Sequence, residues 1–357
     1  MVKEFIAQSP EILPDTFEST WSSPSNIALV KYWGKKEGQI PANPSISFTL
    51  DHCATTTRVK FTRKETPGIS FDLLFEGEPK PSFKPKIQQF IDRILPYMEF
   101  LEGYHLEIDT SNSFPHSSGI ASSASGMSAL ALCLMSLEAA LSGAEEDANF
   151  YKKASFLARL GSGSACRSLE GPLVSWGQHE HISGSSDLYG TPYRGQLHKT
   201  FLDYRDTILL VDKGQKQVSS TVGHGLMHGH PYAEARFEQA HRNLAELLEV
   251  LQNGDSRAFI RIVESEALTL HAMMMSSNPY FILMKPNTLE IINKVWDFRE
   301  KTGSALCFTL DAGANVHLLY PGSEADEVMK FIEDELVDYC EQGQYICDRI
   351  GEGAKRR

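Results

Sequence analysis

The chain has 357 residues, of which 41% are hydrophobic and 22% are charged, and its formal net charge at pH 7 is −12. This composition is ordinary for a globular protein, and the length allows one large domain or two of medium size. Proteins that bind nucleic acids usually present a basic face, so the acidic balance argues against that class. An acidic chain that binds an anion must build a local positive pocket, which makes the positions of its lysines and arginines informative.

Targeting signals and cysteine usage indicate a soluble, cytoplasmic protein. The segment MVKEFIAQSP has no apolar core of the kind that a signal peptide carries. We see no run of roughly 18 apolar residues and therefore expect no membrane span. No two cysteines form a CxxC pair and several lie in apolar runs, so we expect buried free thiols in a reducing compartment. These cysteines are Cys53, Cys133, Cys166, Cys307, Cys340 and Cys347.

The first third of the chain alternates between strand-like and loop-like segments. Residues 1–20 are interpreted as an irregular lead-in. Between Trp21 and Phe61 we expect three strands, SNIALVKYW, SISFTL and TTTRVKF, with the Gly-, Lys- and Pro-rich loop GKKEGQIPANP between the first two. Helical spacing predicts a helix over 86–101, and HLEIDT, from His105, alternates like a strand.

Longer helices dominate the rest of the chain. Apolar spacing predicts helices over 123–141, 145–160, 231–252, 256–273, 288–301 and 323–339. Strands are expected at GPLVSWG, DTILLVD, SALCFTL and NVHLLY, and the tail EGAKRR is expected to be frayed. Because strands and helices mix without a regular βαβ alternation, the pattern favours an α+β fold over a doubly wound sheet.

The segment PHSSGIASSASG, residues 115–126, opens the longest apolar helix. Five serines and two glycines lie between Ser117 and Gly126. A helix start offers unpaired N–H groups and a positive dipole end, and small residues let an anion approach them closely. Serine hydroxyls add donors and a candidate Mg²⁺ ligand. An N-cap loop before a tightly packed helix is the plain alternative, but it explains only one serine and one glycine. Without a GK[ST] sequence, the segment is not a Walker A loop.

Three further segments place charged side chains in short, structured settings. SNIALVKYWGK ends a strand and delivers Lys31, Tyr32 and Lys35 into a loop. GSGSACRS surrounds Arg167 with small residues, a setting that suits bidentate recognition of a carboxylate or phosphate. TLDAG holds Asp311 between two apolar strands. Solvated lysines, an exposed turn arginine and a turn-capping aspartate are the plain structural alternatives.

Taken together, the four segments carry a family resemblance. NIALVKYWGK, GIASSASG, GSGSACRS and FTLDAGANV resemble the motifs of mevalonate diphosphate decarboxylases, within the GHMP kinase superfamily, and they occur in the family's order over most of the chain. The resemblance implies a two-lobed α+β fold with ATP, Mg²⁺ and a small-molecule substrate in a cleft between the lobes. We expect an N-terminal lobe over 1–200, a helix-rich C-terminal lobe over 201–357, and a homodimer.

The resemblance also implies roles for particular residues. Asp311 should lie beside the tertiary hydroxyl of the substrate, Lys31 should assist phosphoryl transfer, and Arg167 should hold the carboxylate. Ser123 should lie near the γ-phosphate and Mg²⁺. The residues expected to bind the substrate are Tyr32, Lys35, Lys86, Ser162, Ser164 and Arg167. Those expected to bind ATP are Pro115, Ser117, Ser118, Gly119, Ser122, Ser123 and Ser125.

The implied reaction is the ATP-dependent decarboxylation of mevalonate 5-diphosphate to isopentenyl diphosphate. Phosphorylation turns a poor tertiary leaving group into a good one, and loss of phosphate then drives loss of CO₂ and alkene formation. Such a transfer needs position and charge neutralisation more than covalent help. Alternatives are a decarboxylase of mevalonate 5-phosphate, a mevalonate 3-kinase, and a nucleotide-binding regulator without catalysis.

Some segments depart from the family pattern. His116, Ser117 and Ser118 stand where the family usually shows Thr-Ala-Ala, and Lys84 and Lys86 stand where it often places an arginine toward the substrate diphosphate. These departures leave the number of substrate phosphates open.

The segment VGHGLMHGH contains three closely spaced histidines, His224, His228 and His230. We do not favour a metal site there, because a Gly-rich loop supplies no carboxylate or thiol partner at ligand spacing.

Overall fold

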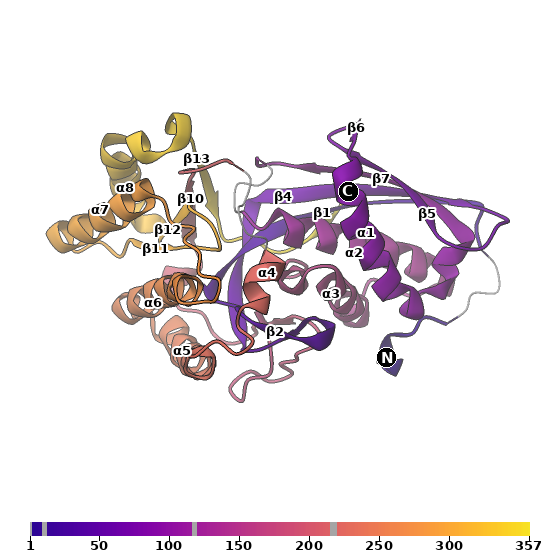
Figure 1. Cartoon of the computed structure of the whole chain (residues 1–357), viewed down its shortest axis with the longest axis horizontal. Helices are drawn as coiled ribbons and strands as arrows, with labels where there is room; N and C mark the ends of the chain where they lie inside the picture. The colour runs from indigo at the N-terminus through magenta and orange to yellow at the C-terminus, as the bar shows by residue number, and fades with distance from the viewer. Residues whose placement is uncertain (1, 9–12, 116–119, 215–219) are drawn as a thin grey trace.

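The computed structural model describes residues 2–8, 13–115, 120–214 and 220–357. An eight-stranded sheet and a four-stranded sheet form the frameworks of two lobes, and a two-stranded hairpin lies near the junction between them (Figure 1). Strands and helices occur in both lobes without a regular βαβ repeat. The arrangement is the α+β, two-lobed one that the sequence predicts.

The eight-stranded sheet belongs to the first lobe. Its main path runs β14-β1-β4-β7-β5-β6, while β8 pairs with β4 and β9 pairs with β8. All pairings are antiparallel except that of β5 with β7. The strands are β1 (Thr16–Val30), β4 (Ser45–Arg63), β5 (Ser70–Phe75), β6 (Glu78–Pro79), β7 (Tyr104–Asn112), β8 (Leu173–Trp176), β9 (Thr191–Pro192) and β14 (Lys355–Arg356).

Three helices cover one face of this sheet, namely α1 (Lys84–Ile94), α2 (Ser122–Ser142) and α3 (Ala148–Gly161) (Figure 1). Helix α2 lies in the middle of the core and is apolar nearly all round, as expected for a helix with neighbours on every side. By length and composition α2 could span a membrane, but 78% of its most apolar window is buried inside the protein, as in the core helix of a globular fold.

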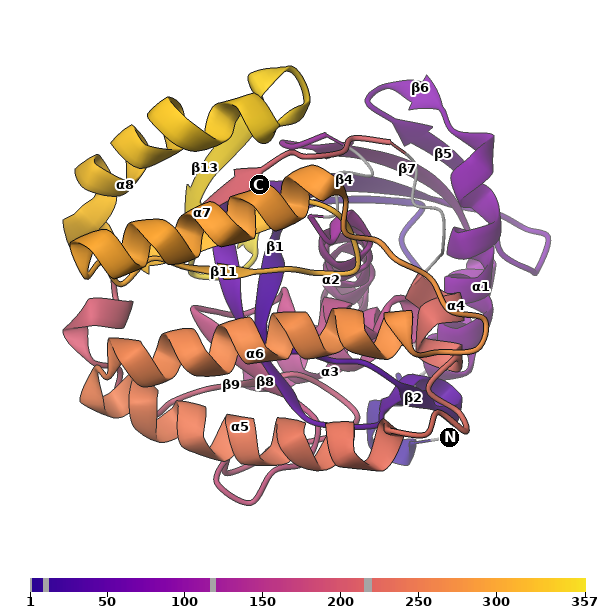
Figure 2. The same ribbon diagram turned by 60° about the vertical axis from the view of Figure 1, so that its left-hand side comes forward.

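The second lobe is built on the antiparallel sheet β11-β12-β10-β13. Alternate residues of its strands enter different cores: Leu318 packs with the helices α7 and α8, while Leu319 packs with α5 and α6. Helices therefore flank the sheet on both sides (Figure 2). The elements are α4 (Ser220–Gly225), α5 (Ala233–Asn253), α6 (Ser256–Met275), α7 (Pro286–Thr302), α8 (Ala325–Phe331), β10 (Tyr204–Leu209), β11 (Cys307–Thr309), β12 (Val316–Pro321) and β13 (Tyr345–Arg349).

Several sequence expectations at element boundaries are corrected. The expected lead-in already contains the start of β1, and SISFTL and TTTRVKF are parts of one strand, β4. Between Thr49 and Ala54, where β4 has no partner on β1, Asp348 of β13 accepts the backbone N–H groups of residues 51–53. The helix expected over 86–101 stops at Ile94, because Pro96 follows and cannot donate to a continuing helix.

The C-terminal segments also differ from expectation. The helix expected over 323–339 is α8 followed by a π-helical turn, Ile332–Leu336. The tail is not frayed: β14 pairs with β1 of the first lobe, with Arg356 opposite Trp21. All six cysteines are free and five are buried, but Cys347 on β13 is exposed. Pairing of the tail with β1 could not be read from local sequence, because its partner lies more than 300 residues earlier.

Candidate active site

A cavity of about 560 Å³ lies between the lobes. Its walls come from the end of β1, one face of α1, the start of α2, the turn Gly163–Arg167 and the loop between β11 and β12. Of the residues singled out by sequence, the cavity brings together Lys31, Tyr32, Lys35, Lys86, Ser122, Ser123, Ser162, Ser164, Arg167 and Asp311. Segments far apart in the sequence therefore meet at one site.

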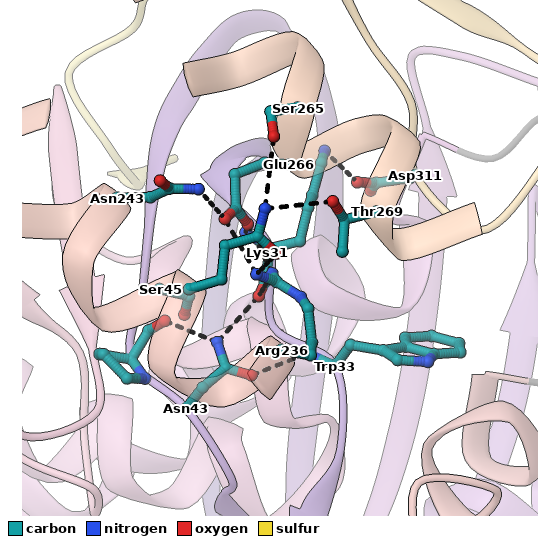
Figure 3. Close-up of polar contacts among 12 residues, drawn as sticks. Lys31, Trp33, Asn43, Ser45, Arg236, Asn243, Ser265, Glu266, Thr269 and Asp311 are labelled. Carbon is teal, nitrogen blue, oxygen red and sulfur yellow. Dashed lines mark hydrogen bonds and ion pairs between the residues drawn. The ribbon is translucent and has the colours of Figure 1, made fainter. Parts of the chain in front are cut away.

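An ion pair between Lys31 and Asp311 joins the two lobes at this cavity. The Lys31 Nζ lies 3.0 Å from the Asp311 Oδ1, and Figure 3 shows the lysine side chain reaching the aspartate. Lys31 is almost fully buried, whereas the side chain of Asp311 keeps 29% exposure toward the cavity. Burial lowers the pKa of Lys31, and the charge of Asp311 opposes that shift. The carboxylate is thus both paired and open to a ligand.

The backbone of Asp311 is fixed as well as its side chain. His271 of α6 donates from Nε2 to the Asp311 carbonyl at 3.1 Å. Burial lowers the pKa of His271 to about 4, so its ring is neutral near pH 7. The Asp311 carbonyl also accepts the N–H of Gly313 at 2.7 Å, which closes a tight turn. These bonds hold the loop that presents the carboxylate.

Arg167 is a buried cation that lines the same cavity, and the residue is only 3% exposed. Its Nη1 donates to the Ser45 hydroxyl, but its Nε has no hydrogen-bond partner among the described residues. Burial lowers the pKa of Arg167, although a guanidinium stays protonated in proteins. A buried donor left unsatisfied is costly, so the guanidinium suits an anionic ligand in the cavity.

Tyr32, next to Lys31 in the chain, packs edge-on against one aromatic ring and at a tilt against another. Its ring centroid is 4.6 Å from that of Trp176 and 4.2 Å from that of His224 of α4. His224 accepts the backbone N–H of Gly34 at Nδ1, and burial lowers the pKa of His224 to about 3. The histidine is therefore a neutral spacer that closes one side of the cavity.

The three histidines of the VGHGLMHGH segment do not converge. His230 faces the Met273 carbonyl at 3.1 Å, and His228 is exposed. Across the described ranges, no group of three or more His, Cys, Asp or Glu side chains could hold a metal ion. His224 instead belongs to the wall of the cavity.

A cationic corner lines the cavity where α1 faces the β2–β3 hairpin (Lys35–Lys36 and Ile40–Pro41). Lys35, Lys86 and Arg93 all line it. Burial, and then the nearby positive charge of Arg93, lowers the pKa of Lys35. Sequence reasoning missed Arg93, although it lies two helical turns after Lys86 on the same face. Lys84 instead lies 3.6 Å from Asp72 and does not line the cavity.

The start of α2 forms the other end of the cavity. Ser122 and Ser123 line it, and the Ser123 hydroxyl lies 3.3 Å from that of Ser162. A smaller cavity of about 120 Å³ shares Ser122, Ser123 and Lys86 with the first and is otherwise largely apolar. The backbone N–H groups and hydroxyls of the first turn of α2 suit phosphate, and the apolar space beside them suits a flat base.

Three of the residues expected to bind ATP, Ser117, Ser118 and Gly119, lie outside the described residues. The structure places Ser125 away from the cavity, where its hydroxyl is fully buried and 2.6 Å from that of Thr55. We therefore withdraw Ser125 from the candidate ligands. Pro115 does not line either cavity.

Comparison with known families identifies this arrangement. Residues 23–188 match the diphosphomevalonate decarboxylase-like N-terminal domain, and residues 207–352 match the mevalonate 5-diphosphate decarboxylase C-terminal domain. The chain belongs to the diphosphomevalonate decarboxylase family. The resemblance seen in the sequence motifs is thereby confirmed.

Individual members of the diphosphomevalonate decarboxylase family align over most of the chain. A diphosphomevalonate decarboxylase from Ganoderma lucidum is 30% identical, over 94% of this chain and 85% of that protein. The crystal structure of mevalonate diphosphate decarboxylase from Staphylococcus aureus is 27% identical, with a TM-score of 0.82, and the match covers 96% of this chain and 98% of that one. A structure described as MDDEF in complex with MVAPP, AMPPCP and magnesium is 25% identical, with a TM-score of 0.81, covering 96% and 99%.

Proposed function

We propose that this protein catalyses the ATP-dependent decarboxylation of mevalonate 5-diphosphate to isopentenyl diphosphate, with release of ADP, phosphate and CO₂. The single observation that carries the proposal is the Lys31–Asp311 pair, 3.0 Å apart in a cavity that also contains Arg167. This pair supplies a carboxylate and a cation at one point, which phosphoryl transfer to a hydroxyl requires. Membership in the family supports the same reaction.

Asp311 and Lys31 act on the two partners of the first step. The Asp311 carboxylate takes or orients the proton of the C3 hydroxyl, so that the oxygen can attack the γ-phosphorus of ATP. The C3–O–P linkage forms as the bond to ADP breaks. The buried Lys31 ammonium neutralises charge on the transferred phosphoryl group, an effect that is strong where water is excluded.

Arg167 acts in the second step. Its guanidinium, with an unsatisfied Nε, holds the substrate carboxylate beside C3. Departure of the C3 phosphate leaves positive charge at that carbon. The electrons of the bond to the carboxylate then form the alkene, and CO₂ leaves. Ser162 and Ser164, which flank the same wall, are proposed to hydrogen-bond this end of the substrate, and Tyr32 is proposed to contact its body.

The remaining charges fit the two phosphate-bearing ends. We assign the substrate diphosphate to Lys35, Lys86 and Arg93, because all three cations line the same cavity and can make charge-assisted hydrogen bonds to phosphate. The ATP phosphates are assigned to the start of α2, near Ser122 and Ser123, and the base to the smaller apolar cavity.

Magnesium fits this ATP end. Mg²⁺ prefers oxygen ligands and commonly uses phosphate oxygens with only one or two protein groups. We propose the Ser123 hydroxyl, which lines the cavity, as such a group, and the presence of AMPPCP and magnesium in the MDDEF structure supports binding of both by the family. When bound, the ion would neutralise charge on the phosphates.

We also propose that the lobes correspond to residues 1–200 and 201–357, with the tail strand β14 returning to the first lobe. A cytoplasmic location is proposed because the cysteines are free and five of the six are buried. A homodimer is proposed because the family motifs lead us to expect one. Light scattering of the purified protein measures the oligomeric state directly.

The test of the reaction is a turnover comparison with Mg-ATP and three substrates: mevalonate, its 5-phosphate and its 5-diphosphate. We expect the highest kcat/KM with the diphosphate and equal release of ADP, phosphate and CO₂. Release of ADP without CO₂ would indicate a 3-kinase. Preference for the monophosphate would overturn the assignment of the cationic corner to a diphosphate.

A further inference from the structure

Buried side chains of the second lobe hydrogen-bond the backbone of Lys31. The last ladder pair of β1 with β4 is Val30 with Ile46, so Lys31 lies just beyond the sheet. Its N–H donates to the Glu266 Oε2 at 2.8 Å. Its carbonyl accepts from the Arg236 Nη2 at 3.1 Å. Helices α5 and α6 thus replace the missing strand partner.

Glu266 and Arg236 form a two-pronged ion pair whose side chains are both 0% exposed. The Arg236 Nη1 lies 2.9 Å from one Glu266 oxygen and the Nη2 lies 2.5 Å from the other. Asn243 donates to the carboxylate at 2.6 Å, and Asn43 donates to the Lys31 carbonyl at 2.9 Å. Figure 3 shows these groups converging on the lysine backbone.

A buried ion pair contributes little net free energy to folding. Desolvation of two charges offsets much of their attraction, and well-packed apolar residues often stabilise a fold equally well. Here both members of the pair also bind the backbone of one residue, and that residue carries the ammonium facing Asp311. The pair therefore hydrogen-bonds the backbone of Lys31, which apolar side chains could not do.

We propose that the Glu266–Arg236 pair is a positioning device, which holds Lys31 at the distance from Asp311 that phosphoryl transfer needs. Lys31 belongs to the first lobe, whereas Glu266, Arg236 and Asp311 belong to the second. Holding the lysine backbone from the second lobe sets the position of Lys31 relative to Asp311 within one rigid frame. The inference rests on the proposed catalytic role of Lys31.

The first test is Glu266→Gln, which keeps the shape of the side chain and removes its charge. We expect kcat to fall by roughly 10- to 100-fold, the cost of a misplacement of about 1 Å, while the KM for ATP changes less than about twofold. The matched control is Glu264→Gln on the same helix. Glu264 is also buried and paired, with Arg299 at 2.6 Å, but it does not contact Lys31. The control should lose thermal stability and keep its kcat.

A second variant keeps the test decisive if Glu266→Gln does not fold. The double substitution Glu266→Leu with Arg236→Met replaces the ion pair by apolar side chains of similar size. We expect a folded protein, because such replacements are often neutral or stabilising, but a kcat reduced at least tenfold. A double variant with the kcat of the wild type would overturn the inference.

A structural measurement separates this inference from the proposed reaction. Crystal structures of the wild type and of both variants give the distance from the Lys31 Nζ to the Asp311 Oδ1. We expect that contact to lengthen beyond hydrogen-bond reach in the variants. If the wild type shows no turnover of any mevalonate substrate, the proposed function fails, yet the distances still decide whether the pair positions Lys31. Unchanged distances would sink the positioning role.

Discussion

Lys31 and Asp311 are 280 residues apart in the sequence, yet their charged atoms lie 3.0 Å from each other. The two residues come from different lobes, and the backbone of each is held by a hydrogen bond. The Lys31 N–H donates to Glu266, and the Asp311 carbonyl accepts from His271. Preorganised charges of this kind need little reorganisation during reaction. The arrangement leads to predictions about individual side chains.

Asp311→Asn should abolish turnover while ATP binding changes little. The substitution keeps the shape and removes the carboxylate, and general bases contribute at least about 10²-fold to kcat. Because phosphorylation at C3 precedes decarboxylation, ADP release and CO₂ release should fall together. Steady-state turnover and nucleotide affinity of the folded variant are the measurements. Near-normal turnover would leave Asp311 as a turn-capping residue only.

Arg167→Lys should be strongly impaired although it keeps the positive charge. Lysine cannot supply the planar fork or the Nε donor that now lacks a partner among the described residues. We expect kcat to fall about 10²-fold, because the carboxylate would be misoriented. Comparison of kcat for the lysine and alanine variants checks this. A lysine variant as active as the wild type would contradict the fork argument.

Arg93→Gln should raise the KM for the diphosphate substrate about tenfold and leave kcat nearly unchanged. Its contact exists in ground and transition states alike, and one charge-assisted hydrogen bond contributes about 1.5 kcal/mol. Lys84→Gln is the matched control, since Lys84 lies on the same helix but faces Asp72 outside the cavity. A KM shift of equal size in the control would show a general charge effect instead of a binding contact.

Stability should fall as the solution is acidified from about pH 6.5 toward pH 4. His224 and His271 have folded-state pKa values of about 3 and about 4, below the ordinary value of 6.5. In that window the unfolded chain binds protons that the folded chain does not, so lower pH favours unfolding. Thermal unfolding of the wild type and of His271→Gln, at several pH values, measures the effect. The His271→Gln variant should show a shallower slope than the wild type, and an equal slope in the two proteins would contradict the prediction.

Local sequence was sufficient for features whose causes are local. The apolar spacing of α5 and α6 predicted both helices to within about two residues, because one face of each packs on a core. The short segments around Lys31, Arg167 and Asp311 likewise carried their chemistry and their family resemblance within about ten residues each. A run of small residues, or a turn between two apolar strands, can be recognised in the sequence without knowing which segments pack against it.

Tertiary structure alone decided which distant groups meet. Nothing near Glu266 or Arg236 marks them as partners of Lys31, because the pair forms only when α5 and α6 pack against the end of β1. In the sequence, Arg93 is one of several cations on an amphipathic helix. Only the fold shows that it lines the same cavity as Lys35. The tail became a strand because the edge of β1 was open to it. Contacts of this kind depend on packing between elements. The local periodicity of a segment does not determine which other segment its surface will contact.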